Sequence, residues 1–164
     1  MGQPGARSDR KGSVMSQYPP NLQKIVSLLE SLPDEEKRET LISYADQAVR
    51  QRPEEGEAFD LEDVRKDEEC TDTVGIFLRV SPERKATFRV TLGPHVQTLT
   101  RAMTAILCKG LNDATVEDVL EVPADFVPKI VGAELVRARS QTVYYILTRM
   151  KSAAKVFLNR ERSA

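Results

Sequence analysis

The chain has 164 residues, 40% of them hydrophobic, and its 24 Lys and Arg residues nearly balance its 25 Asp and Glu residues. This length and composition predict one domain of ordinary size with a real core. A formal net charge of −1 offers no general attraction for nucleic acid, and every apolar run is shorter than the roughly 18 residues of a membrane-spanning helix. These properties argue against a nucleic-acid-binding protein and against a membrane protein.

The ends of the chain differ in character from its middle. Residues 1–18 are expected to form a disordered tail, although their basic residues leave an organellar transit peptide open. Residues 19–159 are expected to form the domain, and residues 160–164 a short C-terminal tail. Two cysteines without a disulfide framework or a secretory signal indicate a reducing compartment inside the cell, either cytoplasmic or organellar.

The domain is predicted to begin with a pair of antiparallel helices. In the first, Leu22, Val26 and Leu29 recur at helical spacing after Pro20. In the second, Pro33 suits the first turn, and the three acidic residues after it suit the positive end of the helix dipole. The buried stripe of the second helix is expected to comprise Leu41, Tyr44, Ala45, Ala48 and Val49.

Residues 51–69 contain nine carboxylates together with Pro53 and Gly56. Such a run is typical of a solvated connection. We expect no metal site there, because the chain has a single histidine, His95, and no spacing that would bring ligands together.

An antiparallel hairpin is predicted next. Residues 73–80 and 86–92 have the apolar and β-branched residues of strands, and residues 82–85 have the composition of a turn. No third strand is evident. Because two strands are marginal alone, helices are expected to cover their apolar face.

The last third is predicted to be helical. One helix carries the stripe Val96, Leu99, Met103, Ile106 and Leu107. Cys108 falls outside this stripe on a helical wheel, so we expect it to be partly exposed and to have no chemical role. A capping box at Thr115 and Asp118, a short helix between Pro123 and Gly132, and a long helix capped by Ser140 complete the chain. The predicted fold class is α+β, without a phosphate-binding loop.

Cys70 is the candidate functional residue. It stands where the acidic connection ends and the first strand begins, so a loop would present its thiol to a partner. A thiolate can attack an electrophilic sulfur and hold it covalently. A packed thiol without a function is the alternative that composition leaves open. We assign His95 to a turn, since a lone histidine gives little support to a Cys/His hydrolase.

Several short motifs occur in the same order as in the SufE family of cysteine desulfuration proteins, and the chain resembles a divergent member of that family from about Tyr18 to Asn159. The motifs are Tyr18-Pro19-Pro20-Asn21-Leu22-Gln23-Lys24-Ile25-Val26, Cys70-x-x-x-Val74, Gly110-Leu111, Pro123-Ala124-Asp125-Phe126 and Arg139-Ser140-Gln141. The resemblance implies a SufE/IscU-like α+β fold with an N-terminal helix pair, a small antiparallel sheet and C-terminal helices.

The resemblance also implies a function in iron–sulfur cluster assembly. Members of the family accept persulfide sulfur from a PLP-dependent, SufS-like cysteine desulfurase, stimulate that enzyme and pass the sulfur to Fe–S scaffold proteins. Cys70 matches the acceptor cysteine of the family. Arg139 matches an arginine near the final helix and is expected to stabilise the thiolate or to contribute to docking. The chain itself is expected to bind no cofactor, because the PLP belongs to the desulfurase.

The surroundings of Cys70 depart from the family pattern. The family usually shows Gly-Cys-x-Ser-x-Val-Trp, whereas this chain has Glu69-Cys70-Thr71-Asp72-Thr73-Val74-Gly75. Neighbouring carboxylates disfavour a thiolate, so Cys70 should need positive charge from Arg139, from Arg137 or from a partner. A second interpretation therefore stays open, in which the chain is a binding adaptor or regulator of a desulfurase without sulfur-carrier chemistry.

Overall fold

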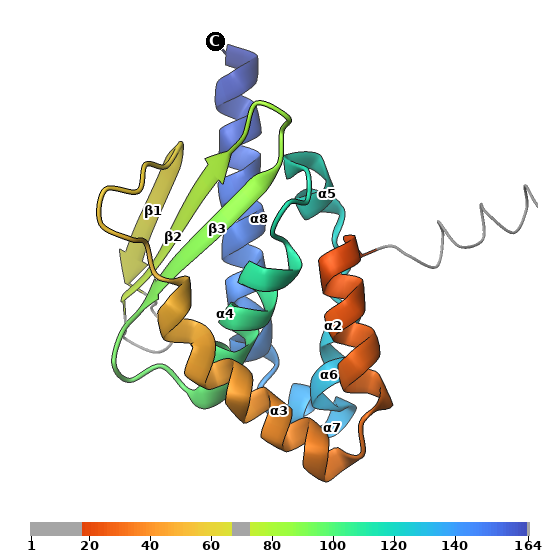
Figure 1. Ribbon diagram of the computed structural model, residues 1–164. Coiled ribbons are helices and arrows are strands. Elements are labelled where there is room, and N and C mark those ends of the chain that lie inside the picture. The colour runs from red at the N-terminus through yellow and green to blue at the C-terminus, as the bar shows by residue number, and fades with distance from the viewer. Residues whose placement is uncertain (1–17, 67–72, 164) are drawn as a thin grey trace, which may run out of the picture.

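A computed structural model of the chain describes residues 18–66 and 73–163. Two helices, a three-stranded sheet and five further helices follow one another in these residues (Figure 1). This order confirms the predicted α+β class with an N-terminal helix pair, a small antiparallel sheet and C-terminal helices. The elements are α2 (Pro20–Ser31), α3 (Asp34–Gln47), η1 (Ala48–Gln51), β1 (Leu61–Lys66), β2 (Thr73–Val80), β3 (Ala86–Leu92), α4 (Thr98–Gly110), α5 (Val116–Glu121), α6 (Phe126–Val131), α7 (Ala133–Ala138) and α8 (Ser140–Ser163).

The sheet has the order β1-β2-β3, and both pairings are antiparallel. Strands β2 and β3 have the predicted bounds. The prediction of a two-stranded hairpin was wrong, because β1 forms a third strand within the stretch that we expected to be a solvated connection. Leu61 of β1 is buried opposite Leu78, but the next positions on the same face are Asp63 and Arg65. The strand therefore lacks the apolar alternation by which strands are recognised.

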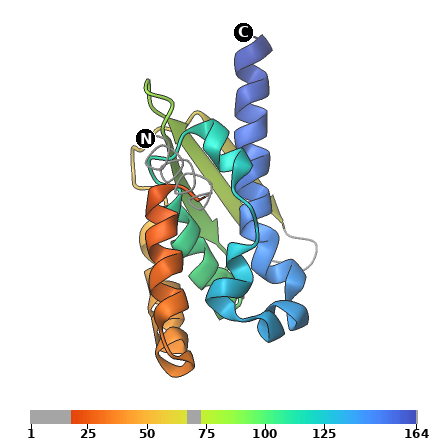
Figure 2. The same cartoon turned by 90° about the vertical axis from the view of Figure 1, so that its right-hand side faces the viewer.

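The inner face of the sheet packs against α4 and α8. Figure 2 shows α8 running along the sheet and projecting beyond it at the C-terminal end. Helix α4 lies at the centre, since α2, α3, α8, β3 and η1 all contact it. Large side chains with less than 2% exposure fill the space between these elements, and they include Phe88, Phe126, Leu22, Leu29, Ile76, Leu78, Met103, Ile106, Leu107, Leu111, Ile130 and Ile146.

The N-terminal helix pair confirms most of the predicted pattern. Leu22, Val26 and Leu29 of α2 are buried. In the second helix Ala45 is buried, but the expected burial of Val49 was wrong, because its side chain is 59% exposed. The α-helical repeat ends at Gln47, and the chain continues as the 3₁₀ turn η1, which changes the direction of the following side chains.

The C-terminal elements also follow local signals. Thr115 caps α5 by accepting a hydrogen bond from the Asp118 N–H at 3.1 Å, as the capping box predicts. The short helix between Pro123 and Gly132 is α6, whereas the one-and-a-half-turn helix α7 was not anticipated. Helix α8 continues past Asn159 to Ser163. Among the residues that the structure describes, no helix is long and apolar enough to cross a membrane.

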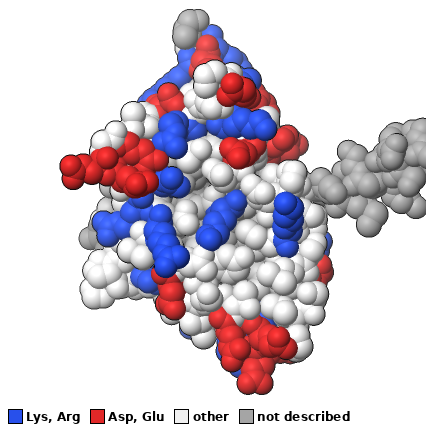
Figure 3. Space-filling model, in the orientation of Figure 1, with Lys and Arg blue, Asp and Glu red and all other residues white. Residues whose placement is uncertain are grey.

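Charged side chains of both signs share the surface. Figure 3 shows Lys and Arg interspersed with Asp and Glu over the upper part of the face, and an acidic cluster at its lower tip. Helix α3 begins there with Asp34, Glu35 and Glu36. This mixture agrees with the absence of a strong net charge and gives the visible face no broad polyanion-binding surface.

Candidate functional site

Cys70 belongs to the segment that joins β1 to β2, and it lies outside the described residues. The strands on either side of it are paired with each other up to Lys66 at the end of β1 and Thr73 at the start of β2. The fold therefore assigns the candidate cysteine to the connection of an antiparallel hairpin. We call the paired residues 61–66 and 73–78 the hairpin base.

Arg139 directly precedes α8, and that helix begins at the same end of the domain as the paired ends of β1 and β2 (Figure 1). It is exposed at the junction of α7 and α8, and its Nη1 donates to Gln97 Oε1 at 2.5 Å. Gln97 precedes α4, so this contact joins the starts of the two helices that cover the sheet. Arg137 is likewise exposed on α7. Whether either guanidinium approaches Cys70 stays a prediction.

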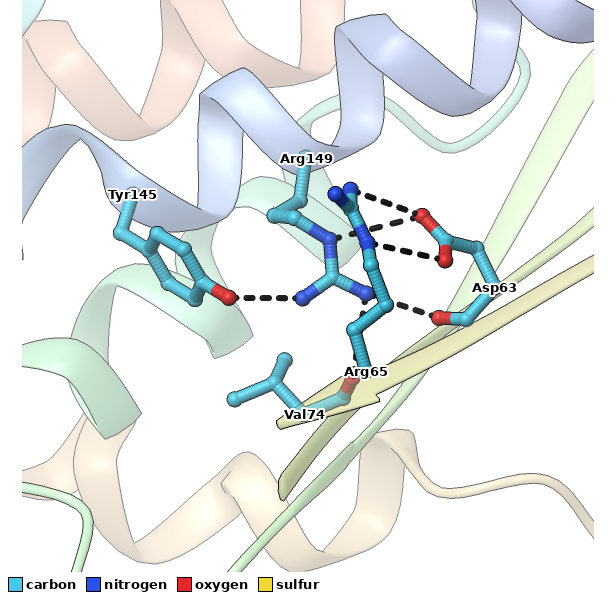
Figure 4. A network of polar contacts seen from close by, with 5 residues as sticks. All are labelled: Asp63, Arg65, Val74, Tyr145 and Arg149. Atoms are coloured by element: carbon cyan, nitrogen blue, oxygen red, sulfur yellow. Dashed lines mark hydrogen bonds and ion pairs between the residues drawn. The ribbon is translucent and has the colours of Figure 1, made fainter. Parts of the chain in front are cut away.

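A buried arginine that the sequence interpretation missed connects α8 to the hairpin base. Arg149 is 3% exposed, and its guanidinium donates to two backbone carbonyls and one hydroxyl (Figure 4). Nη2 reaches the Asp63 carbonyl of β1 at 2.8 Å and the Val74 carbonyl of β2 at 3.0 Å, while Nη1 reaches the Tyr145 hydroxyl at 2.8 Å. One side chain thus holds both strands of the hairpin base against α8.

The carboxylate of Asp63 completes this cluster. It accepts from Arg65 at 3.0 and 3.1 Å, and one of its oxygens lies 3.5 Å from Arg149 Nε. Two guanidinium groups therefore face one carboxylate, which leaves the cluster with an excess of positive charge. Asp63 occupies a position on the inner face of the sheet that an apolar residue would normally take, because Arg149 brings a buried charge there that needs an anion.

The position of Arg149 on its helix is the signal that could have revealed it. Arg149 follows Ile146 by three residues and precedes Ala153 by four, and both of these residues are buried. Residues at such spacings share one face of a helix. A charged residue inside an apolar stripe predicts a buried polar contact, although its partners on β1 and β2 are distant in sequence.

Cys108 is buried, with 4% of its surface exposed, and the predicted partial exposure was wrong. The helical wheel fails here because other elements cover α4 on several sides, so that all of residues 102–108 are buried. Burial raises the pKa of the Cys108 thiol to about 12, which keeps it protonated at neutral pH. Because a protonated, inaccessible thiol is a poor nucleophile, its surroundings disfavour a chemical role for Cys108.

Other candidate groups remain separate. His95 is exposed in the connection between β3 and α4, as expected for a residue in a turn. Within residues 18–66 and 73–163, no three His, Cys, Asp or Glu residues are grouped so that they could hold a metal ion.

Comparison with known proteins identifies the family. A family model described as "SufE: Fe-S metabolism associated domain" matches residues 23–154. The chain belongs to the SufE family. As a member, it carries a domain associated with Fe–S metabolism, and the recognition from short motifs is confirmed. None of the curated proteins matches the chain.

Solved structures support the SufE fold. A solution structure of a hypothetical protein from Thermus thermophilus is 24% identical, with a TM-score of 0.68 over 87% of this chain and 98% of that one. The crystal structure of a nitrogen-fixing NifU-like protein (N-terminal) from Brucella abortus is 13% identical, with a TM-score of 0.52 over 73% of this chain and 92% of that one. At these identities the likeness shows the fold alone.

Proposed function

We propose that this SufE-family protein is a sulfur carrier that accepts persulfide sulfur on Cys70 from a PLP-dependent cysteine desulfurase and passes it on for iron–sulfur cluster assembly. The observation that carries the proposal is the family match from residue 23 to residue 154, which spans the segment with Cys70. The hairpin supports the same role, because the connection between two paired strands can present a thiol to a protein partner.

The transfer step is a thiol–persulfide exchange. The Cys70 thiolate attacks the outer sulfur of a cysteine persulfide on the desulfurase, a new S–S bond forms to Cys70, and the S–S bond of the donor breaks. The desulfurase cysteine leaves as a thiolate that takes up a proton. Since one S–S bond replaces another, the step needs no external oxidant or reductant.

Arg139 has a supporting role in this proposal, as a thiolate stabiliser or a docking residue. It is exposed directly before α8, so it is accessible to a partner. A guanidinium there would counter the carboxylates of Asp67, Glu68, Glu69 and Asp72 that surround Cys70 in the sequence. The partners in the proposal are a SufS-like desulfurase and Fe–S scaffold proteins.

The domain limits belong to the same proposal. Residues 19–159 form the functional unit, and the protein works in a reducing compartment where Cys70 stays a free thiol. The chain contributes the acceptor thiol, and the desulfurase contributes the PLP.

The acidic sequence around Cys70 favours a second candidate function. Like charges disfavour the thiolate, so the chain would act as a binding adaptor or regulator of a desulfurase without carrying sulfur. The two functions differ in whether a covalent sulfur appears on Cys70.

Persulfide loading tests the proposal. The protein is incubated with a cysteine desulfurase, PLP and cysteine, and its intact mass is read beside those of Cys70→Ser and Cys108→Ser. A gain of one sulfur that is absent only from Cys70→Ser supports the carrier. Binding to the desulfurase without any gain of sulfur contradicts the carrier and favours the adaptor.

A further inference from the structure

The hairpin base is joined at one point by a side chain rather than by apolar packing. On the inner face, Asp63 of β1 stands opposite Ile76 of β2, and Arg65 stands opposite Val74. Neither pair is apolar on both sides, so this part of β1 gains little from the hydrophobic contact that normally holds an edge strand. Arg149 supplies the connection instead, through the carbonyls of both strands.

We propose that Arg149 is a positioning residue for sulfur acceptance, which it serves by fixing the two strands that carry the Cys70 connection. This inference rests on the proposed carrier function of Cys70. Arg149 belongs to α8, so its guanidinium ties the placement of the hairpin base to that helix (Figure 4). The first residue of α8, Ser140, follows Arg139. The ten residues from Arg139 to Arg149 span about 15 Å of helix, which keeps their two roles distinct.

The shape of the guanidinium suits this task. Its planar fork presents several N–H donors in fixed directions, and here two of its nitrogens are occupied by three acceptors on β1, β2 and α8. Tyr145, one turn earlier on the same helix, holds Nη1 and has its ring 5.6 Å from the Arg149 guanidinium carbon. A lysine would bring one charge to the same place without the fork, so it could not hold both strands and Tyr145 together.

Transfer of sulfur is sensitive to such placement. The incoming persulfide and the attacking thiolate must meet at close distance and in line, and a displacement of about 1 Å can reduce a rate about a hundredfold. Loss of Arg149 frees β1 to shift against β2 at the paired residues that precede and follow the Cys70 connection. The expected consequence is slower sulfur acceptance after the desulfurase has bound.

The test compares persulfide loading by wild type, Arg149→Met and Val90→Ala at saturating desulfurase. Val90 is 1% exposed in β3, a strand that does not pair with β1, and it makes none of the contacts of Arg149. Its truncation therefore lowers stability without touching the cluster. We expect the loading rate of Arg149→Met to fall about tenfold to a hundredfold, while folded Val90→Ala loads at the rate of wild type.

Two results overturn the inference while the carrier function stands. If Arg149→Met loads at the wild-type rate, the contacts of Arg149 with the two strands do not position the thiol. Equal slowing of Arg149→Met and Val90→Ala shows that Arg149 acts through overall stability alone. If Arg149→Met does not fold, Arg149→Lys takes its place, and slower loading by this variant supports the fork geometry, whereas wild-type loading contradicts it.

Failure of the carrier function gives a different pattern. In that case wild type takes up no sulfur, and the alkylation rate of Cys70 by iodoacetamide, followed across pH in the same proteins, decides on Arg149. A profile altered in Arg149→Met but not in Val90→Ala supports positioning of the thiol. Identical profiles in all three proteins contradict it.

Discussion

The two halves of the sheet are held together by different kinds of contact. Between β2 and β3 the inner face pairs apolar residues, with Val74 opposite Leu92, Ile76 opposite Val90 and Leu78 opposite Phe88. Between β1 and β2 the same face is apolar only at Leu61, and Arg149 joins the strands near the Cys70 connection. The half that carries the proposed site thus depends on one buried polar cluster, which can be removed by a single substitution.

Among the substitutions considered, Arg149→Met should lower the free energy of unfolding most, because it removes the cluster that joins β1 to β2. The substitution removes the Arg149 hydrogen bonds to the Asp63 and Val74 carbonyls together with a buried charge, for an expected loss of about 3 kcal/mol in the free energy of unfolding. Urea unfolding measures the loss. Amide hydrogen exchange should quicken in β1 more than in β3, and equal changes in both strands would contradict the comparison. Arg84→Gln, which removes exposed ion pairs at the other end of the sheet, serves as the control and should leave the unfolding midpoint close to that of wild type.

Gly75→Ala tests how closely the side chains of β1 and β3 approach β2 on the outer face of the sheet. A Cβ at Gly75 would lie 2.5 Å from Thr91 Oγ1 of β3 and 3.1 Å from Val64 Cγ2 of β1. Crowding from both sides should cost about 1–3 kcal/mol in thermal or urea unfolding. Thr91→Ala in the same chain removes the shorter contact, so the double variant should regain part of the loss. No recovery would show that the strain arises elsewhere.

The burial of Cys108 on α4, which packs against β3, predicts that the free energy of unfolding depends on pH. Burial raises the pKa of this thiol to about 12, whereas the pKa of an unfolded cysteine is about 8.5. The folded state therefore keeps the proton on this thiol to a higher pH than the unfolded state does. The resulting stabilisation is complete below the pKa of the unfolded thiol and decreases as the pH rises from there toward the pKa of the folded thiol. The fall should approach about 1.4 kcal/mol per pH unit above about pH 9.

Cys108→Ala isolates this effect. Other groups also titrate in alkaline solution, so the measured quantity is the difference in unfolding free energy between wild type and Cys108→Ala at each pH. The difference should change between about pH 8 and about pH 10 and stay flat at lower pH. A flat difference throughout would mean that the thiol is accessible to solvent in the folded protein.

The smallest effect is expected at Val64. Its side chain is 55% exposed on the outer face of β1, so Val64→Thr should change the free energy of unfolding by less than about 0.5 kcal/mol. Val90→Thr makes the same chemical change at a position that is 1% exposed and should cost about 1–3 kcal/mol, since it buries a hydroxyl. Similar losses in both variants would mean that β1 is held by apolar packing after all.

Local pattern was enough to predict β2, β3, α2 and the cap at Thr115. Each of these features follows from residues that are neighbours on one strand or one helical face. Strand β1 could not be predicted in this way, because the partner that makes Asp63 suitable is Arg149, far along the chain. The burial of Cys108 escaped for the same reason, since it results from several elements that cover α4 together.

The candidate site was predictable in part. Several short motifs in a shared order, which include Cys70 and Arg139, led to the SufE family, and the family match confirms this recognition. The roles of Cys70 and Arg139 in sulfur transfer stay predictions. The contact of Arg139 with Gln97 was not anticipated, because the start of α4 meets the start of α8 only in the folded chain. Arg149 was overlooked although its place in the apolar stripe of α8 pointed to burial.

The most direct test of the carrier account is to locate the sulfur after loading. After incubation with desulfurase, PLP and cysteine, the protein is alkylated, digested and sequenced by mass spectrometry. The account predicts one additional sulfur on the peptide with Cys70, an unmodified peptide with Cys108, and loss of the sulfur when an Fe–S scaffold protein is added. Sulfur on Cys108, or no sulfur on either peptide while the desulfurase still binds, would contradict it.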